Sequence, residues 1–202
     1  MAVVSIKNKL RRGNLLAGND PYIPTDFESI ATTLLTTTAS SVTFSSIPAT
    51  FDHLQVRYLA QTNRGTYGRD VVRLEINSFA VSNYASHFLS GDGSTASASA
   101  ETTANNVFAL AGVAGTTTAG ADFFGASIVD ILDYKNTNKN KTIRTLGGVD
   151  VNGTVGGAGG EVVLQSGLLI STNAITSLTF KPNTGTLFSA DSHFALYGIK
   201  GA

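Results

Sequence analysis

The alternation that decides the fold lies in one ten-residue stretch, His53-Leu54-Gln55-Val56-Arg57-Tyr58-Leu59-Ala60-Gln61-Thr62. Successive side chains of a β-strand point to opposite faces, so every second residue of the stretch shares one face. That face would carry Leu54, Val56, Tyr58 and Ala60. The same period of two recurs at Val72, Leu74 and Ile76, and again at Phe194, Leu196 and Gly198. Such alternation predicts strands with one buried and one exposed face.

Further strands are predicted wherever Val, Ile, Thr and aromatic residues cluster between turn residues. These stretches are 30–35, 41–44, 84–89, 125–132, 142–151, 161–170 and 175–180. Hairpin tips are expected at 90–93, 136–140 and 181–185, where Gly and Asn tolerate a positive φ. About ten strands suit two facing sheets, which predicts an all-β fold, a jelly-roll-like antiparallel β-sandwich over residues 27–202.

Three stretches are rich in small residues, namely 94–106, 115–121 and 153–160. Their side chains offer too little apolar surface to pack independently. We expect them to be long loops, or edge segments ordered by their neighbours.

The composition favours a protein that works in an assembly. Hydrophobic residues make up 42% of the 202 residues and charged residues only 14%, with a net charge of zero. Charged residues are about 25% of ordinary proteins, so a weakly charged exterior suits surfaces that neighbours cover. Cysteine is absent, which excludes disulfides, thiolate metal sites and a cysteine nucleophile. No secretory signal and no transmembrane stretch is evident, so we expect no membrane insertion.

Residues 1–26 are predicted to form an extended basic arm. Four of the first 19 residues are basic and none is acidic, no regular period is present, and Gly and Pro punctuate the segment. Four charges without interleaved aromatic residues are a small footprint for nucleic acid, so a protein surface is the expected partner. The residues expected to make this assembly contact are Val4, Ile6, Lys7, Lys9, Arg11, Arg12, Leu15 and Leu16.

No motif in the chain predicts catalysis or a cofactor. The sequence lacks a Gly-x-Ser-x-Gly elbow, and His53, His87 and His193 all lie in strand-like runs. Asp130 and Asp133 would point to opposite faces of a strand. The glycine-rich run 156–160 leads into a strand rather than a helix, unlike a phosphate-binding loop. We expect no catalytic residues, no metal and no cofactor.

Four phrases carry a resemblance to a known group. They are Ser-Ile-Pro-Ala-Thr-Phe-Asp-His-Leu-Gln-Val-Arg at 46–57, Asn-Tyr-Ala-Ser-His at 83–87, Ile-Leu-Asp-Tyr-Lys-Asn-Thr-Asn-Lys at 131–139 and Phe-Ala-Leu-Tyr-Gly-Ile-Lys-Gly at 194–201. Together they resemble virion structural proteins of tailed bacteriophages, over about residues 27–201. In that group, similar stretches form a β-sandwich of tail-fibre or knob proteins and of other exterior virion components. Many members carry it after a long fibrous or coiled region, whereas this chain has only the short arm and no heptads.

The resemblance and the composition together lead to one expected function and two alternatives. The leading expectation is a non-enzymatic, tail-associated short fibre or knob on the virion exterior, self-associating, with a trimer suspected. Its arm would join other virion subunits. The runner-up is a head decoration protein that clamps capsomers. The third is an enzyme that degrades host glycans.

Any contact with a host-surface glycan is expected in loop tips, because loops on a rigid sandwich can vary while strands keep their alternation. The candidate tips are 63–69, 90–95 and 136–140. In the first, Tyr67 could stack on a sugar, and Arg64 and Arg69 could donate hydrogen bonds to acidic groups. An ordinary hairpin end explains the same residues.

Overall fold

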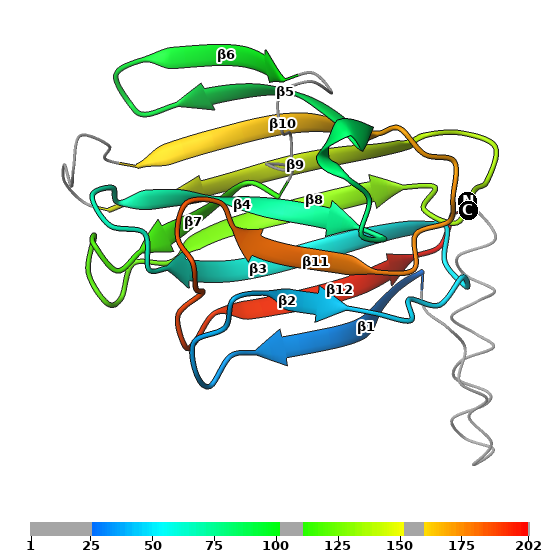
Figure 1. Cartoon of the computed structure of the whole chain (residues 1–202), viewed down its shortest axis with the longest axis horizontal. Coiled ribbons are helices and arrows are strands. Elements are labelled where there is room, and N and C mark those ends of the chain that lie inside the picture. Colours follow the sequence, from blue (N-terminus) through cyan, green and yellow to red (C-terminus); the bar gives the residue numbers. More distant parts are fainter. Residues whose placement is uncertain (1–25, 102–110, 152–159, 202) are drawn as a thin grey trace, which may run out of the picture.

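The computed structural model describes residues 26–101, 111–151 and 160–201, and β-strands dominate them (Figure 1). One turn of 3₁₀ helix, η1 (Val81–Asn83), precedes β5. The strands are β1 (Phe27–Leu34), β2 (Val42–Phe44), β3 (His53–Thr62), β4 (Arg69–Ile76), β5 (Tyr84–Gly91), β6 (Ala96–Glu101), β7 (Val113–Thr116), β8 (Gly125–Leu132), β9 (Lys141–Val149), β10 (Glu161–Leu169), β11 (Leu178–Pro182) and β12 (His193–Ile199).

Eight strands form the large layer of the molecule, in the order β1-β12-β3-β8-β9-β10-β5-β6. Every neighbouring pair in this layer is antiparallel. The layer therefore alternates between one face that covers the core and one that points outward.

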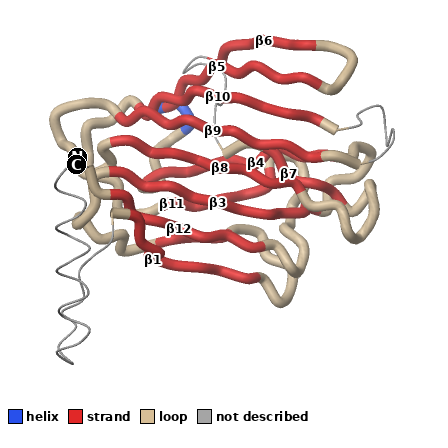
Figure 2. The backbone as a smooth tube through the Cα atoms, turned by 180° about the vertical axis from the view of Figure 1, so that it is seen from behind, coloured by secondary structure: helices blue, strands red, loops and turns tan. Residues whose placement is uncertain are grey.

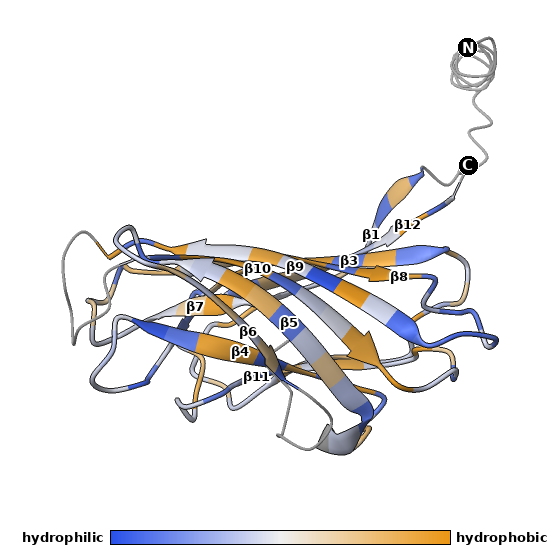
Figure 3. Ribbon diagram, turned by 90° about the horizontal axis from the view of Figure 1, so that it is seen from above, coloured by the Kyte–Doolittle hydropathy of each residue, from blue (hydrophilic) through white to orange (hydrophobic). Residues whose placement is uncertain are grey.

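A smaller layer of β2, β11 and β4 lies against the large one, and Figure 3 shows β4 and β11 beneath the level of β9 and β10. The short strand β7 joins the layers, because it pairs with β4 antiparallel and with β3 parallel. The described residues thus make one mixed, twelve-stranded sheet that folds over on itself.

The core fills the space between the layers with the residues that the alternation marks. Leu54, Val56 and Ala60 of β3 are fully buried, as are Val72, Leu74 and Ile76 of β4, so the predicted inward faces are confirmed. Aromatic rings complete the centre: Tyr58 stacks on Phe194 with 5.2 Å between ring centroids, and Phe188 meets Phe194 edge-on at 5.1 Å. Aromatic pairs at these spacings add to the free energy of burial.

The sequence prediction is right about the all-β class and differs in two details. The described residues hold twelve strands rather than ten, because β6 and β7 fall wholly or partly in stretches predicted as loops or neighbour-ordered edges. The β3–β7 pair is parallel, which departs from a wholly antiparallel sandwich. None of the described segments forms a helix with the length and apolar character needed to cross a bilayer.

Gly198 shows why one glycine of the C-terminal phrase is needed. A Cβ atom at this position would lie 2.3 Å from the ring of Phe51. The ring packs directly on the β12 backbone, so any larger side chain would force the two apart.

Candidate functional site

The two ends of the strands carry different groups. The described chain begins at Asp26, whose carbonyl oxygen accepts a hydrogen bond from the Lys200 amide at 2.9 Å. The Gly201 amide donates to Asp52 Oδ2 at 2.6 Å, so residue 26 and the last described residues lie together. We call this the arm end. The eight arm residues named above lie outside the described residues.

A charged cluster surrounds His53 at the arm end, where β3 begins and β8 ends. The Asp133 amide donates to His53 Nδ1 at 3.0 Å. Lys135 Nζ lies 2.9 Å from Asp52 Oδ1 and holds the pKa of that carboxyl below its usual range, and Lys139 does the same for the pKa of Asp133. His53 Nδ1 therefore already accepts a main-chain hydrogen bond, and Asp52 and Asp133 are each paired with a lysine.

These groups do not form a metal site. Among the described residues, no three His, Asp or Glu side chains converge in a way that could hold a metal ion. The acids Asp130 and Asp133, weighed as a catalytic pair, have separate partners: Asp130 accepts from Gln55 Nε2 at 2.7 Å and pairs with Arg144 at 2.9 Å. The cluster is best explained as a network that fixes the loop between β8 and β9.

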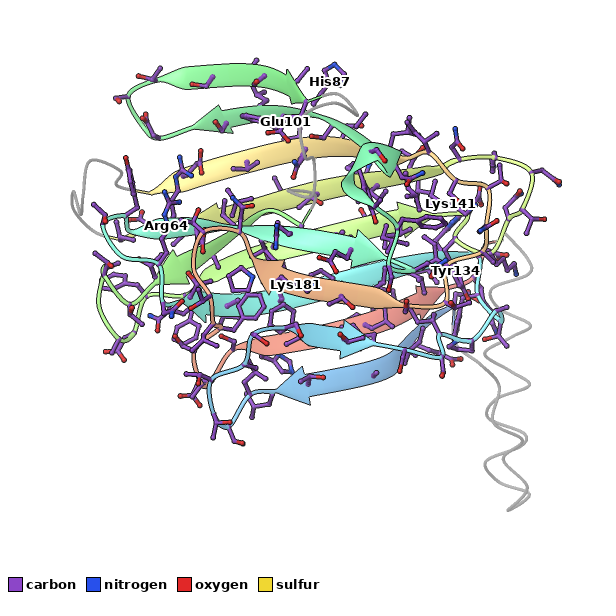
Figure 4. The ribbon with its side chains drawn as sticks, in the orientation of Figure 1. Arg64, His87, Glu101, Tyr134, Lys141 and Lys181 are labelled. Atoms are coloured by element: carbon purple, nitrogen blue, oxygen red, sulfur yellow. The ribbon has the colours of Figure 1, made fainter. Side chains whose placement is uncertain are left out.

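The predicted ligand-contact loop lies at the opposite end, which we call the loop end (Figure 4). Of Arg64, Tyr67 and Arg69, only Tyr67 is exposed, at 41%. The Arg64 guanidinium carbon lies 4.4 Å from the centroid of the Tyr67 ring, and Arg64 Nη1 donates to the Arg69 carbonyl at 3.2 Å. Arg69 Nε lies 2.9 Å from Glu161 Oε2 in an ion pair with little exposure. The structure therefore brings the three residues together but directs both guanidinium groups into the protein.

The three candidate tips divide between the two ends. The register of β3 with β8 puts residues 63–69 at the end where β8 begins, and the register of β5 with β10 puts 92–95 beside Glu161. The Arg69–Glu161 ion pair joins the first tip to the start of β10, beside the second tip. The third tip, 136–140, belongs to the arm end with Asp52 and Asp133.

A buried carboxylate holds the loop end together. Asp70 has no exposed surface, and its Oδ2 accepts from Thr62 Oγ1 at 3.1 Å and from the Gly185 amide at 2.8 Å. Its Oδ1 accepts from the Val71 amide at 2.9 Å and the Thr184 amide at 3.2 Å. Sequence reasoning missed Asp70, although it lies two residues before Val72 and so in the buried phase of the strand.

A buried lysine, Lys141, holds the arm end together. Lys141 is fully buried, and its Nζ donates to the carbonyl oxygens of Asn136 at 2.5 Å, Lys139 at 2.9 Å and Thr172 at 3.0 Å. Burial lowers the pKa of Lys141. Lys141 also was missed, and it too shares the buried phase of its strand, with Ile143.

The outward face of the large layer carries a row of exposed apolar side chains, and Figure 2 looks onto this side. Paired registers align Ile128 of β8 with Leu146 of β9, Leu164 of β10 and Leu89 of β5. They are 37%, 54%, 48% and 53% exposed. The row is therefore continuous across four neighbouring strands, and we call it the outer ridge.

A row of mostly small residues runs beside the outer ridge, one step nearer the loop end. Registers align Ala126 with Gly148, Val162 and Gly91. A shallow hollow of about 480 Å³ is lined by Ala126 and Gly148 together with Ile128 and Leu146 of the ridge. A second, of about 500 Å³, is lined by Gly91, Gly148 and Val162 and by Asp92 and Asp150. Contiguous apolar patches on a protein surface often mark interaction sites, so the outer face is the best candidate for one.

No family model matches the chain, and no curated protein matches it.

Proposed function

We propose that this chain is a non-enzymatic structural protein of a tailed-phage virion, a short tail-associated fibre or knob component on the particle exterior. In this proposal the folded-over sheet is a jelly-roll-like β-sandwich whose arm joins other virion subunits and whose outer face contacts neighbouring copies. The observation that carries the assembly role is the outer ridge of exposed Ile128, Leu146, Leu164 and Leu89, and the virion part of the proposal rests on the resemblance of the four sequence phrases. A face of this kind costs solubility in a lone protein and is typical of subunits in an assembly.

The arrangement of the two ends supports the same proposal. The junction with the arm lies at one end of the strands, and two of the three candidate tips lie at the other. A component anchored through its arm would therefore present Tyr67 and the neighbouring 92–95 turn away from the attachment point. Tyr67, the exposed member of its trio, is the candidate for stacking on a host-surface glycan.

The first experiment asks whether the protein is part of a particle. Quantitative mass spectrometry of purified virions should find the chain at a low copy number that matches a tail component, and gold-labelled antibodies should mark the tail. A copy number that matches the capsomers would favour the head-decoration alternative. Absence from washed particles would refute a virion role.

The second experiment tests the glycan contact. Tyr67→Ala is preferable to replacing the whole trio, because Arg69 holds the largely buried Glu161 and its loss would disturb the fold. Phage carrying Tyr67→Ala should adsorb to host cells more slowly while incorporating the protein normally. A matched control is Leu132→Ala, at a residue of β8 that is also 41% exposed and lies at the arm end. Equal adsorption by the wild-type and Tyr67→Ala phages would remove this loop as a receptor contact.

Incubation with host polysaccharide tests the alternative that the protein is a glycan-degrading enzyme. Purified protein should leave the polymer length unchanged. Depolymerisation would contradict the structural role and reopen the search for a catalytic pair.

A further inference from the structure

The outward residues of β9 have an order that complements itself. From the arm end to the loop end they are Arg144, Leu146 and Gly148, and Asp150 follows just beyond the strand: a cation, a large apolar side chain, a position without side chain, and an anion. Arg144 is 66% exposed at its side chain and Leu146 is 54% exposed. If a second β9 lies across this face in the reverse direction, Leu146 meets Gly148 and Arg144 meets Asp150, twice over.

The neighbouring strands repeat the order of large then small. Ile128 is followed toward the loop end by Ala126 on β8, and Leu89 by Gly91 on β5. On β10 the pair is Leu164 and Val162, both large and both exposed. On three of the four strands, a large ridge residue is therefore followed by a small residue. In the reversed copy, the ridge of each chain would pack against the row of small residues of the other.

The size of the face suits a dimer. The apolar area runs over β8, β9, β10, β5 and the alanines of β6, and Ala98 of β6 continues the ridge beside Leu89. Five strands and the six residue steps from Arg144 to Asp150 span roughly 24 Å by 20 Å. That is about 500 Å² in projection for each partner, or about 1,000 Å² in total, which is at the small end of specific interfaces and suits a weak, reversible dimer. Two sheets packed in this way would lie about 10 Å apart.

We propose that the outer face binds the same face of a second copy of this chain, with the two β9 strands antiparallel and related by a twofold axis that runs parallel to the ridge, midway between it and the row of small residues. The pairing rests on the assembly role proposed above, and it specifies the partner as this chain itself. A twofold interface is isologous, so each contact between two residues occurs twice. It predicts dimers, or higher even-numbered assemblies, in place of the simple trimer suspected from the sequence.

Sedimentation equilibrium of the purified full chain tests the stoichiometry. The wild-type protein should show a concentration-dependent equilibrium between 21.0 kDa and twice that mass. Leu146→Glu places a charge on the ridge and should raise the dimer dissociation constant at least a hundredfold. The control Ile170→Glu, at an exposed apolar residue outside the ridge, should leave it unchanged. A wild-type chain that stays monomeric, or a dimer that Leu146→Glu leaves intact, would overturn the proposal.

A charge exchange tests the orientation without relying on one variant's folding. Asp150→Arg should weaken the dimer about tenfold or more, since it places two arginines opposite one another. Arg144→Asp should weaken it as well, and it also removes the ion pair with Asp130 of its own chain. The double variant should bind more tightly than either single one. Additive weakening in the double variant would exclude the antiparallel arrangement.

The absence of cysteine makes the occupant itself identifiable. Leu146→Cys, labelled with a thiol-attached photo-cross-linker, should link to residues 141–151 of a second copy in the peptide map. Cross-links to residues 1–25 would assign the outer face to the arm instead. Both results are independent of virion mass spectrometry, so the dimer and the virion role can fail separately.

Discussion

Two charged residues, Asp70 and Lys141, lie in the interior at opposite ends of the sheet and bind the loops beyond their own strands. Asp70 accepts from the chain on either side of it, through Thr62 and Gly185. Lys141 donates to three main-chain carbonyl oxygens. A buried charge is tolerated only where hydrogen bonds replace its lost water, and both residues meet that condition.

Replacing Lys141 removes three donors at once. We expect Lys141→Met to lower the free energy of unfolding by roughly 3 kcal/mol, since three carbonyl oxygens would lose the charged donor that binds them. Urea denaturation at neutral pH measures the change. Lys139→Met, at a side chain that is 56% exposed, should cost less than about 1 kcal/mol. Equal losses in the two variants would show that Lys141 does not hold these loops.

Glu161 predicts a dependence of stability on pH. Burial raises the pKa of Glu161 above its usual 4.5, against the opposing influence of Arg69. The folded chain then binds the proton more tightly than the unfolded chain, so the contribution of Glu161 is greatest below its unfolded pKa and is lost as the pH rises through the folded pKa.

The free energy of unfolding of the wild type, minus that of Glu161→Gln, should therefore fall as the pH rises from about 4 to 7. Denaturation series across that range would measure it. A difference that grows with pH would mean that the ion pair with Arg69 outweighs the burial of the carboxylate.

At the scale of the element, the strands divide sharply into a buried and an exposed phase, and β4 is the clearest case. Leu74→Ala and Ile76→Ala should each lower the free energy of unfolding by about 2–5 kcal/mol, because both side chains are fully buried. Thermal or urea unfolding supplies the value. The control Leu34→Ala, at a residue 58% exposed on β1, should stay within about 0.5 kcal/mol. Unchanged melting of both β4 variants would contradict the register of β4.

Strands could be predicted from the sequence where one phase is apolar and the other polar, as in β3 and β4. β7 could not, because all four of its residues are buried and its Val-Ala-Gly-Thr sequence has no alternation. β6 consists mainly of Ala and Ser and is ordered by its pairing with β5, a contact that no local pattern records.

The candidate site could be predicted only in part, because some of its contacts join strands that are far apart in the sequence. Arg64, Tyr67 and Arg69 stand close together in the sequence, but the partner of Arg69 is Glu161, on a distant strand. The sequence of β8 holds one sign of the outer ridge. Ile128 and Leu132 lie on its outward face, where a strand with one exposed face usually carries polar residues. Only the sheet register shows that Ile128, Leu146, Leu164 and Leu89 are neighbours.

At the scale of the molecule, the arm and the sheet are predicted to be separable. Asp26 contacts Lys200 and belongs with the sheet, so the cut is best made after residue 25. We expect the chain without residues 1–25 to keep its circular dichroism and melting temperature but to be missing from purified virions. Normal incorporation of the shortened chain would refute the anchoring role of the arm. Unfolding would show that residues 1–25 stabilise the sheet.

The pairing of β1 with β12 has a consequence for synthesis of the protein. β12 is the only described partner of β1, and it lies between β1 and β3 in the sheet. About 160 residues separate the two strands, so at ordinary translation rates β1 waits roughly ten to thirty seconds on the ribosome before its partner emerges. β1 can join the large layer only after β12 has emerged, so until then its edge stays unpaired and open to other chains.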